Sequence, residues 1–532
     1  MTNGNGVFDP KAYGAVGDGV TDDSAAFVAW NAAMRATSVS GMPSAHFVTR
    51  AQGYIPPGRY LITTPEALLT TAAGITNGWV VEGAGRQLTT IEFRPPTPGA
   101  LMKNNDQYRH LRFEGITFVG GNSNATCVDS ISQGGGASNY HFQNCEFMGT
   151  WADGIRLAGD AEADNNSEWL FTKCSIKGTY TRAFFTCGDG GANQMQDQFV
   201  NYDFVGCEVY LTSGGFINMI YGGAVRVLGG TLQMQGAGTL FTLGNPIHYS
   251  GCTSLHVEGQ RVELRGATSK LIDCVWKNGN ITFDTCMFNA TAVASSTIIA
   301  SFDGSGDCGP IVTWDNCRMA GKQEYKFGSN TWMAQPGRAI YRNCYIPYEH
   351  MQDSIVNTPV GATDALGGMW LIDFDRCRGA STYGSSGSLP GYEVVGNWQR
   401  RRGGEVVPHY RSIKTHNGTL PNSGVNGNAD TWLPLNATIL SVWFFLPAGV
   451  AGAYTSGGWS YTLKTTEESP TTIASLTDAV NGQDIGFNVR TVLAAPFVCD
   501  SDAKRKLTLI AKANGSPNYT TGLCVVEFLP GS

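Results

Sequence analysis

This chain has few charged residues and no long apolar run. Asp, Glu, Lys and Arg make up 15% of its 532 residues, and the net charge of −7 comes without a basic block. A nucleic-acid partner is not expected, because binding to phosphates needs clustered cations. Membrane insertion is not expected either, since no window reaches the roughly 18 uninterrupted apolar residues that a spanning helix needs.

Motifs for metals and for secretion are also missing. The sequence contains no CxxC or HExxH motif and its eight His form no cluster, so we expect neither zinc nor another cofactor. The N-terminus, MTNGNGVFDP, lacks a charged region followed by an apolar stretch. We therefore expect synthesis in a cytoplasm, where the 14 Cys stay reduced.

Glycine, by contrast, is abundant. The 68 Gly, together with many Thr, Asn and aromatic residues, favour short strands joined by tight turns over helical bundles. The length of the chain favours two or three domains.

Seven of the 14 cysteines occur in one recurring pattern, in which alternating apolar residues precede and follow the Cys. Examples are YHFQNCEF (140–147), WLFTKCSI (169–176) and ITFDTCMF (281–288). The Cys positions, or Gly115, Gly230 and Gln260 in their place, recur every 23 to 33 residues up to Cys377. A repeat of this length built from strands predicts a solenoid of parallel strands with an interior Cys column. Buried thiols pack as small hydrophobic groups.

A solenoid has an open end, and residues 23–36 are suited to cover it. Asp22 or Asp23 begins a predicted amphipathic helix there. Its apolar face is expected to hold Ala25, Ala26, Phe27, Trp30, Ala33 and Met34.

The residue pattern of the sequence changes after residue 396. We predict a cap and first strands at 1–63, a parallel β-helix at 64–396 and a polar linker at 397–430. Strand patterns such as ATILSVWFFL and RKLTLIAKA predict a C-terminal antiparallel β-sandwich at 431–532. The predicted fold class is therefore all-β.

Two N-terminal motifs carry a family resemblance. GAVGDGVTDDSAA (14–26) and YIPPGRY (54–60) resemble the start of the right-handed parallel β-helices of the pectate-lyase-like superfamily. The chain looks most like the tailspike and depolymerase branch found on bacteriophages. This resemblance implies a homotrimer in the virion that contacts other phage tail proteins. It also implies binding and cleavage of bacterial capsular polysaccharide or O-antigen. The C-terminal domain would then clamp the trimer or bind sugar.

Cleavage of a glycosidic bond needs two carboxylates, and the coil alignment indicates where to look. The residue two positions before each Cys position is expected to point outward. That column reads Phe113, Gln143, Thr172, Val205, Leu228, Glu258, Asp284, Asp315, Arg342 and Asp375. Glu258, Asp284 and Asp315 are thus acids on successive coils, and we take them as candidate catalytic residues. Neighbours suit a retaining mechanism and alternate members an inverting one.

Other readings of these residues stay open. The column is ordinary solvated surface if Arg261, Arg318 and Arg342 neutralise it. Otherwise Arg261 and Arg318 are candidate substrate-binding residues, with Trp276 and Trp332 as aromatic platforms for sugar rings. Glu208 and Glu263 form a second candidate pair, and Trp314 is assigned to the core.

One resemblance is incomplete. WADGIRL (151–157) looks like the first catalytic motif of polygalacturonases, but the following coils lack the partner motifs, so Asp153 is expected to be a turn residue. An endoglycosidase is the leading function. A polysaccharide lyase and a non-catalytic carbohydrate-binding adhesin are the alternatives.

Overall fold

The computed structural model describes residues 7–346 with gaps, and after residue 346 the strands with a few flanking residues. The gaps are at 38, 41–45, 49–51, 72–74, 107, 133–136, 160–164, 189–198, 221, 245–253, 277–278, 295, 304–309 and 329–337. The chain divides into two compact units, Met1–Phe302 with Thr313–Gly321 and Asp303–Val312 with Lys322–Ser532.

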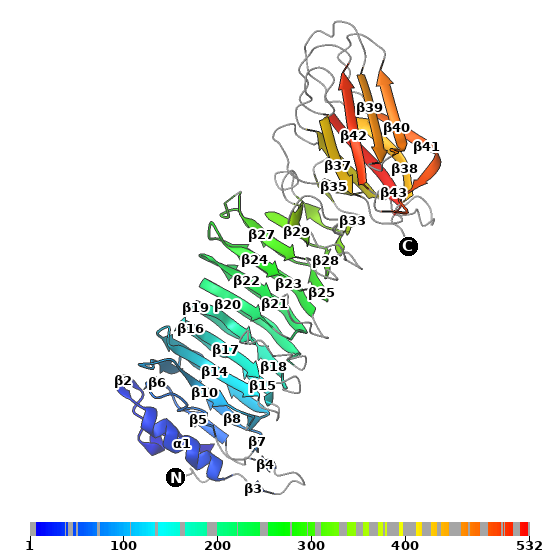
Figure 1. Cartoon of the computed structure of the whole chain (residues 1–532). Coiled ribbons are helices and arrows are strands. Elements are labelled where there is room, and N and C mark those ends of the chain that lie inside the picture. The colour runs from blue at the N-terminus through cyan, green and yellow to red at the C-terminus, as the bar shows by residue number, and fades with distance from the viewer. Residues whose placement is uncertain are drawn as a thin grey trace. The chain divides into compact units, whose positions relative to one another are not determined.

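The first unit is a stack of coils whose strands pair in parallel with those of the next coil (Figure 1). Each coil contributes to three faces. Face 1 contains β8 (Val80–Gly83), β12 (Leu111–Glu114), β15 (Ala137–Gln143), β18 (Asn166–Thr172), β25 (Asn280–Asp284) and β28 (Ile311–Asp315), with the first parts of β20 (Tyr202–Met219), β21 (Val225–Met234) and β23 (Ser254–Leu264).

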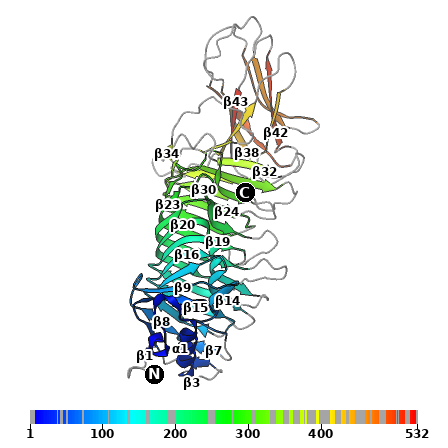
Figure 2. The ribbon, with the colours of Figure 1, turned by 90° about the vertical axis from the view of Figure 1, so that its left-hand side faces the viewer.

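Faces 2 and 3 follow in the chain direction. Face 2 contains β6 (Gly58–Ile62), β9 (Thr89–Phe93), β13 (Thr117–Gly121), β16 (Glu146–Trp151) and β26 (Met287–Asn289), with the first part of β19 (Ser175–Cys187) and later parts of β20, β21 and β23. Face 3 contains β10 (Gly99–Asn104), β14 (Ala125–Ser132), β17 (Asp153–Gly159), β22 (Gly238–Leu243), β24 (Lys270–Cys274) and β27 (Ile298–Asp303), with the ends of β19 and β20. Figure 2 shows the same stack from the side.

Stacked aromatic rings fill the interior behind face 1. Phe142 lies parallel to Phe171 with ring centroids 5.3 Å apart, and Phe171 to Phe204 at 4.7 Å. These distances match the spacing of paired strands, about 4.8 Å. Further along, Phe283 stacks on Trp314 at 4.4 Å, so Trp314 belongs to the core as predicted.

The Cys column is interior, as the repeat predicts. Asn144, Lys173, Thr285 and Asn316 each adopt a φ of 50–52°, which turns the chain from face 1 to face 2 just before a buried Cys. The Cys174 thiol donates a hydrogen bond to the Phe142 carbonyl of the preceding coil at 3.2 Å. The Cys317 thiol does the same with Phe283 at 3.3 Å, so Cys286 and Cys317 lie on neighbouring coils.

One position of the predicted alignment is wrong. Gly115 has a φ of 65° and therefore occupies the turn position, while the buried Ile116 takes the interior Cys position. Glu114 then pairs with Gln143 in the outward column. Phe113, which was assigned to that column, is instead fully buried against Phe142.

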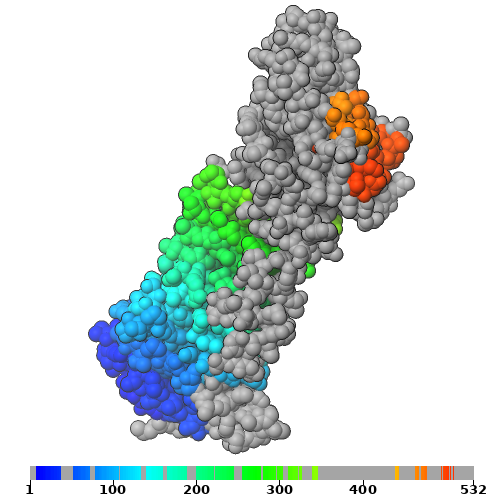
Figure 3. All heavy atoms as spheres, viewed as in Figure 1, coloured from blue at the N-terminus to red at the C-terminus, as the bar shows by residue number. Residues whose placement is uncertain are grey.

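The N-terminal segment closes one end of the stack. It contains β1 (Val7–Phe8), the 3-10 helix η1 (Pro10–Tyr13), β2 (Asp18–Asp22) and α1 (Ser24–Ala36). Phe27, Trp30 and Met34 of α1 are buried. A Cβ atom added to Gly53 of β5 (Gln52–Ile55) would lie 2.5 Å from the Trp30 ring. Figure 3 shows this segment, in dark blue, at the end of the stack.

Of the two aspartates expected at the start of the helix, Asp22 is the one whose side chain bonds to α1. The Asp23 carboxylate accepts hydrogen bonds from the amides of Val16 and Gly17 rather than from α1. Asp22 instead accepts from the Ser24 amide.

Small strands β3 (Val39–Ser40), β4 (His46–Val48), β7 (Ile75–Asn77) and β11 (Tyr108–Arg109) form a separate sheet.

The second unit contains parallel pairs followed by antiparallel sheets. The parallel pairs are β29 (Lys322–Gly328) with β32 (Ile355–Val360), β30 (Arg338–Arg342) with β33 (Leu371–Asp375) and β31 (Tyr345–Ile346) with β34 (Arg378–Gly379). One antiparallel sheet has the order β35 (Glu393–Gly396), β36 (Arg411–Asn417), β43 (Gly522–Leu529), β38 (Thr438–Phe445), β41 (Asn488–Val498). The other has the order β37 (Gly427–Trp432), β42 (Lys506–Ala513), β39 (Trp459–Thr465), β40 (Thr472–Asp478).

The described strands give the predicted fold class, a nearly all-β chain with a parallel β-helix and a C-terminal antiparallel part. Strand β36, and most of β37, fall in residues 397–430, the segment expected to be a linker. They pair with β43 and β42.

Candidate functional site

The three candidate catalytic acids occupy one outward row of face 1. Glu258 pairs directly with Asp284 on the next coil. The Thr285 amide donates a hydrogen bond to the Asp315 carbonyl at 2.9 Å, which aligns Asp284 with Asp315. Their backbones are thus about 4.8 Å apart from coil to coil. Long-range pairing brings together acids that are far apart in sequence.

The three carboxylates differ in their exposure to solvent. Glu258 is 54% exposed, and its Oε2 lies 3.1 Å from Nε2 of His256 on the same strand. Asp284 is half-buried and accepts hydrogen bonds from the Thr285 hydroxyl at 2.8 Å and the Asn316 amide at 3.5 Å. Asp315 is also half-buried. A row of one exposed and two half-buried carboxylates on rigid strands can meet a ligand that lies along the coils.

Arg261 and Arg318 lie on face 2, beyond the turn that ends face 1. Arg261 pairs with Met287, which bridges in turn to Arg318 on the following coil. The Arg261 guanidinium forms an ion pair with Glu263, so this arginine is engaged by a carboxylate other than those of the row. Glu263 itself is only 4% exposed because arginines cover it. It is therefore not an open partner for the exposed Glu208.

Trp276 and Trp332 were predicted to stack on sugar rings, and the structure describes only Trp276. Trp276 is buried, with 4% of its surface exposed, and its ring fills the space where Gly244 has no side chain. A sugar-stacking tryptophan needs an open ring face, so its burial counts against that role for Trp276. Trp332 lies outside the described residues.

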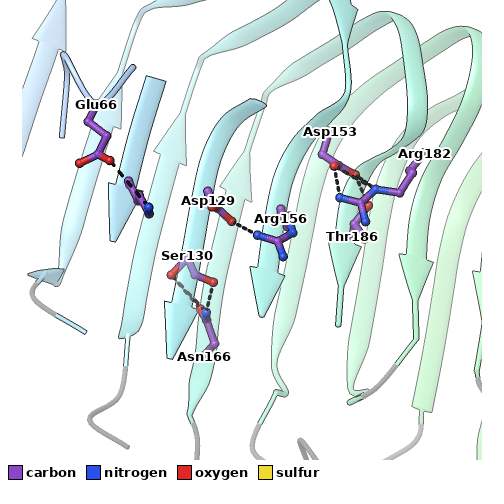
Figure 4. A network of polar contacts seen from close by, with 9 residues as sticks. Glu66, Asp129, Ser130, Asp153, Arg156, Asn166, Arg182 and Thr186 are labelled. Carbon is purple, nitrogen blue, oxygen red and sulfur yellow. Dashed lines mark hydrogen bonds and ion pairs between the residues drawn. The ribbon is translucent and has the colours of Figure 1, made fainter. Parts of the chain in front are cut away.

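A polar row on face 3 was not found from the sequence. Lys103, Asp129 and Arg156 pair in successive register on β10, β14 and β17. The row continues through Thr186, Asn218, Thr242 and Asp273. Asp129 accepts a 2.7 Å ion-pair contact from Arg156 (Figure 4). Lys103 lies 3.7 Å from Glu66. No sequence motif marks this row, because its members share only a register position on face 3.

Asp153 begins strand β17 and is buried, so the expectation of a turn residue is wrong. Its carboxylate accepts two hydrogen bonds of 3.0 Å from Nε of Arg182 and one of 2.6 Å from the Thr186 hydroxyl (Figure 4). The side chain is 2% exposed, whereas that of Arg182 is 40% exposed. The partners come from the next coil, which the sequence motif alone does not reveal.

Within the described part of the chain, no group of three or more His, Cys, Asp and Glu side chains is arranged to hold a metal ion. No helix in that part is long and apolar enough to cross a membrane.

Comparison with known families places the fold. Residues 8–216 match the family described as rhamnogalacturonase A/epimerase, pectate lyase-like. The strands described in this range form stacked parallel coils, so this part of the chain has a pectate-lyase-like β-helix fold. A comparison with curated proteins gives no match.

Several solved structures are similar at low identity. The Agl-KA catalytic domain aligns with a TM-score of 0.45 and 13% identity, over 71% of this chain and 66% of that one. The N-terminal fragment of gene product 12 of bacteriophage Phi29 aligns with a TM-score of 0.38 and 12% identity, over 70% of each chain. ORF18 of Geobacillus virus E2 aligns with a TM-score of 0.33 and 12% identity, over 97% of this chain and 80% of that one.

Proposed function

We propose that this protein is a polysaccharide depolymerase, an endoglycosidase acting on bacterial capsular polysaccharide or O-antigen. The observation that carries the proposal is the outward row of Glu258, Asp284 and Asp315 on successive coils of face 1. The match to a pectate-lyase-like family supports a carbohydrate ligand.

The chemistry follows from the spacing of the carboxylates. One acid in its protonated form donates a proton to the glycosidic oxygen as the bond to the anomeric carbon breaks. A second carboxylate then attacks that carbon or removes a proton from the attacking water. Neighbouring members of the row have the backbone spacing of a retaining pair, and Glu258 with Asp315 has that of an inverting pair.

The biological setting is part of the same proposal. The protein serves as a phage tailspike, in which three copies form a homotrimer attached to other tail proteins and cut the host polysaccharide during adsorption. Trimer formation is tested by light scattering on the full chain. A mass near three times 56.9 kDa supports it, and a mass equal to one chain contradicts it.

Single substitutions test the catalytic row. Glu258→Gln, Asp284→Asn and Asp315→Asn keep the side-chain shape and remove the charge. We expect at least one of them to slow release of reducing ends by two orders of magnitude or more, with polysaccharide binding retained. Asp203→Asn is the matched control, because Asp203 also points outward from face 1 but is paired with Arg226 at 2.6 Å.

Two alternatives predict different results. A lyase would release fragments with a new double bond, since it eliminates the leaving group without adding water. A non-catalytic adhesin would bind the polysaccharide and leave its length unchanged, whichever residue of the row is substituted.

A further inference from the structure

Two neighbouring acids of the outward row on face 1 are each held through one oxygen. Nε2 of His256 lies 3.1 Å from Oε2 of Glu258 on the same strand. Oδ1 of Asp284 accepts a hydrogen bond from the Thr285 hydroxyl at 2.8 Å, and the Asn316 amide reaches the same atom at 3.5 Å. In the part of the chain that the structure describes, no side chain bonds to Oε1 of Glu258 or to Oδ2 of Asp284. These two oxygens are therefore available to a substrate.

The register of the strands brings the two held acids together. Glu258 pairs with Asp284, so their backbones are about 4.8 Å apart. Carboxyl groups about 5 Å apart are the arrangement of a retaining glycosidase. Reacting groups must be held to within about 0.5 Å. A glutamate as exposed as Glu258, at 54%, therefore needs a neighbour that fixes its side chain.

His256 differs from the donors around Asp284 because an imidazole can carry a positive charge. A cation beside a carboxylate favours its ionised form. Arg226 pairs with His256 on the preceding coil, but Nε of Arg226 donates to Asp203 at 2.6 Å, so this arginine is engaged elsewhere. The Thr285 hydroxyl is uncharged, and Oδ1 of Asp284 can accept from it whether Asp284 is ionised or protonated.

We infer that His256 is a positioning residue that holds Glu258 as the attacking carboxylate, with Asp284 as the proton donor. This inference rests on the proposed glycosidase function and selects the reacting pair within the row. Oε1 of Glu258 forms a bond to the anomeric carbon as the glycosidic bond breaks, and the Asp284 proton passes to the departing oxygen. Water then attacks the anomeric carbon, Asp284 takes one of its protons and Glu258 leaves as a carboxylate. Asp315 takes no part in either step.

Steady-state kinetics of His256 variants test the positioning role. The probe is the capsular polysaccharide or O-antigen that the full native chain cleaves, and released reducing ends give kcat and KM. His256→Leu, which cannot donate, should lower kcat about tenfold or more and leave KM within about twofold. His256→Gln should recover most of the rate, because its amide can donate to Oε2 of Glu258. The double variant His256→Leu/Glu258→Gln should be no slower than Glu258→Gln alone, since both changes act through one carboxylate.

Thr282→Val is the matched control. Thr282 pairs with His256 on the next coil, and it precedes Asp284 by two residues as His256 precedes Glu258. We expect this variant to cleave at the native rate. Equal losses in His256→Leu and Thr282→Val, or in His256→Leu and His256→Gln, would overturn the positioning role. Circular dichroism confirms that each variant is folded.

The configuration of the first product tests the choice of pair. Proton NMR should show that the new reducing end keeps the anomeric configuration of the cleaved linkage, and Asp315→Asn should cleave within about threefold of the native rate. Inversion would overturn the pair. If Asp315→Asn alone among the row variants abolishes cleavage, the proposed function stands and the inferred pair is wrong. If all three row variants cleave like the native chain, or if the native chain cuts no polysaccharide, the proposed function fails and the pair fails with it.

Discussion

The ion pair between Asp153 and Arg182 is expected to respond unequally to removal of its two partners. The carboxylate is 2% exposed and the guanidinium 40% exposed. Removing Arg182 therefore leaves a charge that water cannot reach easily. Removing Asp153 leaves a guanidinium that turns into solvent. The two single substitutions should differ in cost even though they break the same contact.

The magnitudes follow from burial. Arg182→Ala leaves the Asp153 charge with only the Thr186 hydroxyl as a neighbour within the group, and a stranded buried charge costs about 3 kcal/mol or more. Asp153→Ala leaves the hydroxyl of Thr186, which is fully buried, without its acceptor, at about 1–2 kcal/mol. The double variant should cost little more than Asp153→Ala alone, because no stranded charge remains.

Urea unfolding followed by circular dichroism at pH 7 measures these free energies. Arg226→Ala and Asp203→Ala serve as controls, because that pair is more exposed, at 57% and 22%, and should cost about 0–1 kcal/mol. A stranded buried charge is refuted if Arg182→Ala is no more destabilising than Arg226→Ala, or if the two single costs add in the double variant.

Three further predictions concern the turns, the thiols and the acid side of the pH range. Gly230→Ala should destabilise by about 2 kcal/mol or more, because the new Cβ would lie 2.0 Å from the Cys207 carbonyl oxygen at a φ of 110°. Gly229→Ala, at a φ of 63° with open space, should cost about 1 kcal/mol in the same urea assay, and equal costs would contradict the steric argument. Burial raises the pKa of the Cys145 and Cys187 thiols to about 12, so native protein at pH 8 should take up few alkyl groups and unfolded, non-reduced protein all 14. A shortfall by mass spectrometry in the unfolded sample would reveal disulfides. The Arg265 hydrogen bond, aided by the charge of Arg261, lowers the pKa of Glu263 from 4.5. This stabilisation is present above pH 4.5 and is lost as the pH falls through the lowered pKa, so Arg265→Gln should lose less stability than the native chain between pH 5 and pH 3.

The coil architecture was predictable because each coil repeats one pattern. Alternating apolar residues ending in a small buried residue identify the corner between faces 1 and 2, and Cys145 and Cys174 mark it unambiguously. Gly115 misled the alignment because glycine fits both the interior position and the turn position. Only the pairing of Glu114 with Gln143 distinguishes the two.

The charged clusters were harder to predict, because their side chains come from different coils. Their burial also depends on which neighbouring side chains cover them. Asp153 meets Arg182 and Thr186 from the following coil. Glu92 is covered partly by Arg59 of the preceding coil. Trp276 has no local signal of burial, since the space it fills is provided by Gly244 on the preceding coil. Register along the coils was predictable, but the direction and covering of individual side chains were not.

Mass analysis of polysaccharide fragments tests the catalytic row most directly. Capsular polysaccharide or O-antigen from candidate hosts is incubated with the native chain, with the variants Glu258→Gln, Asp284→Asn and Asp315→Asn, and with Asp203→Asn. We expect fragments heavier by one water per cleavage from the native chain and from Asp203→Asn, and their near-complete loss in at least one row variant. Fragments that persist undiminished in all three row variants would contradict it.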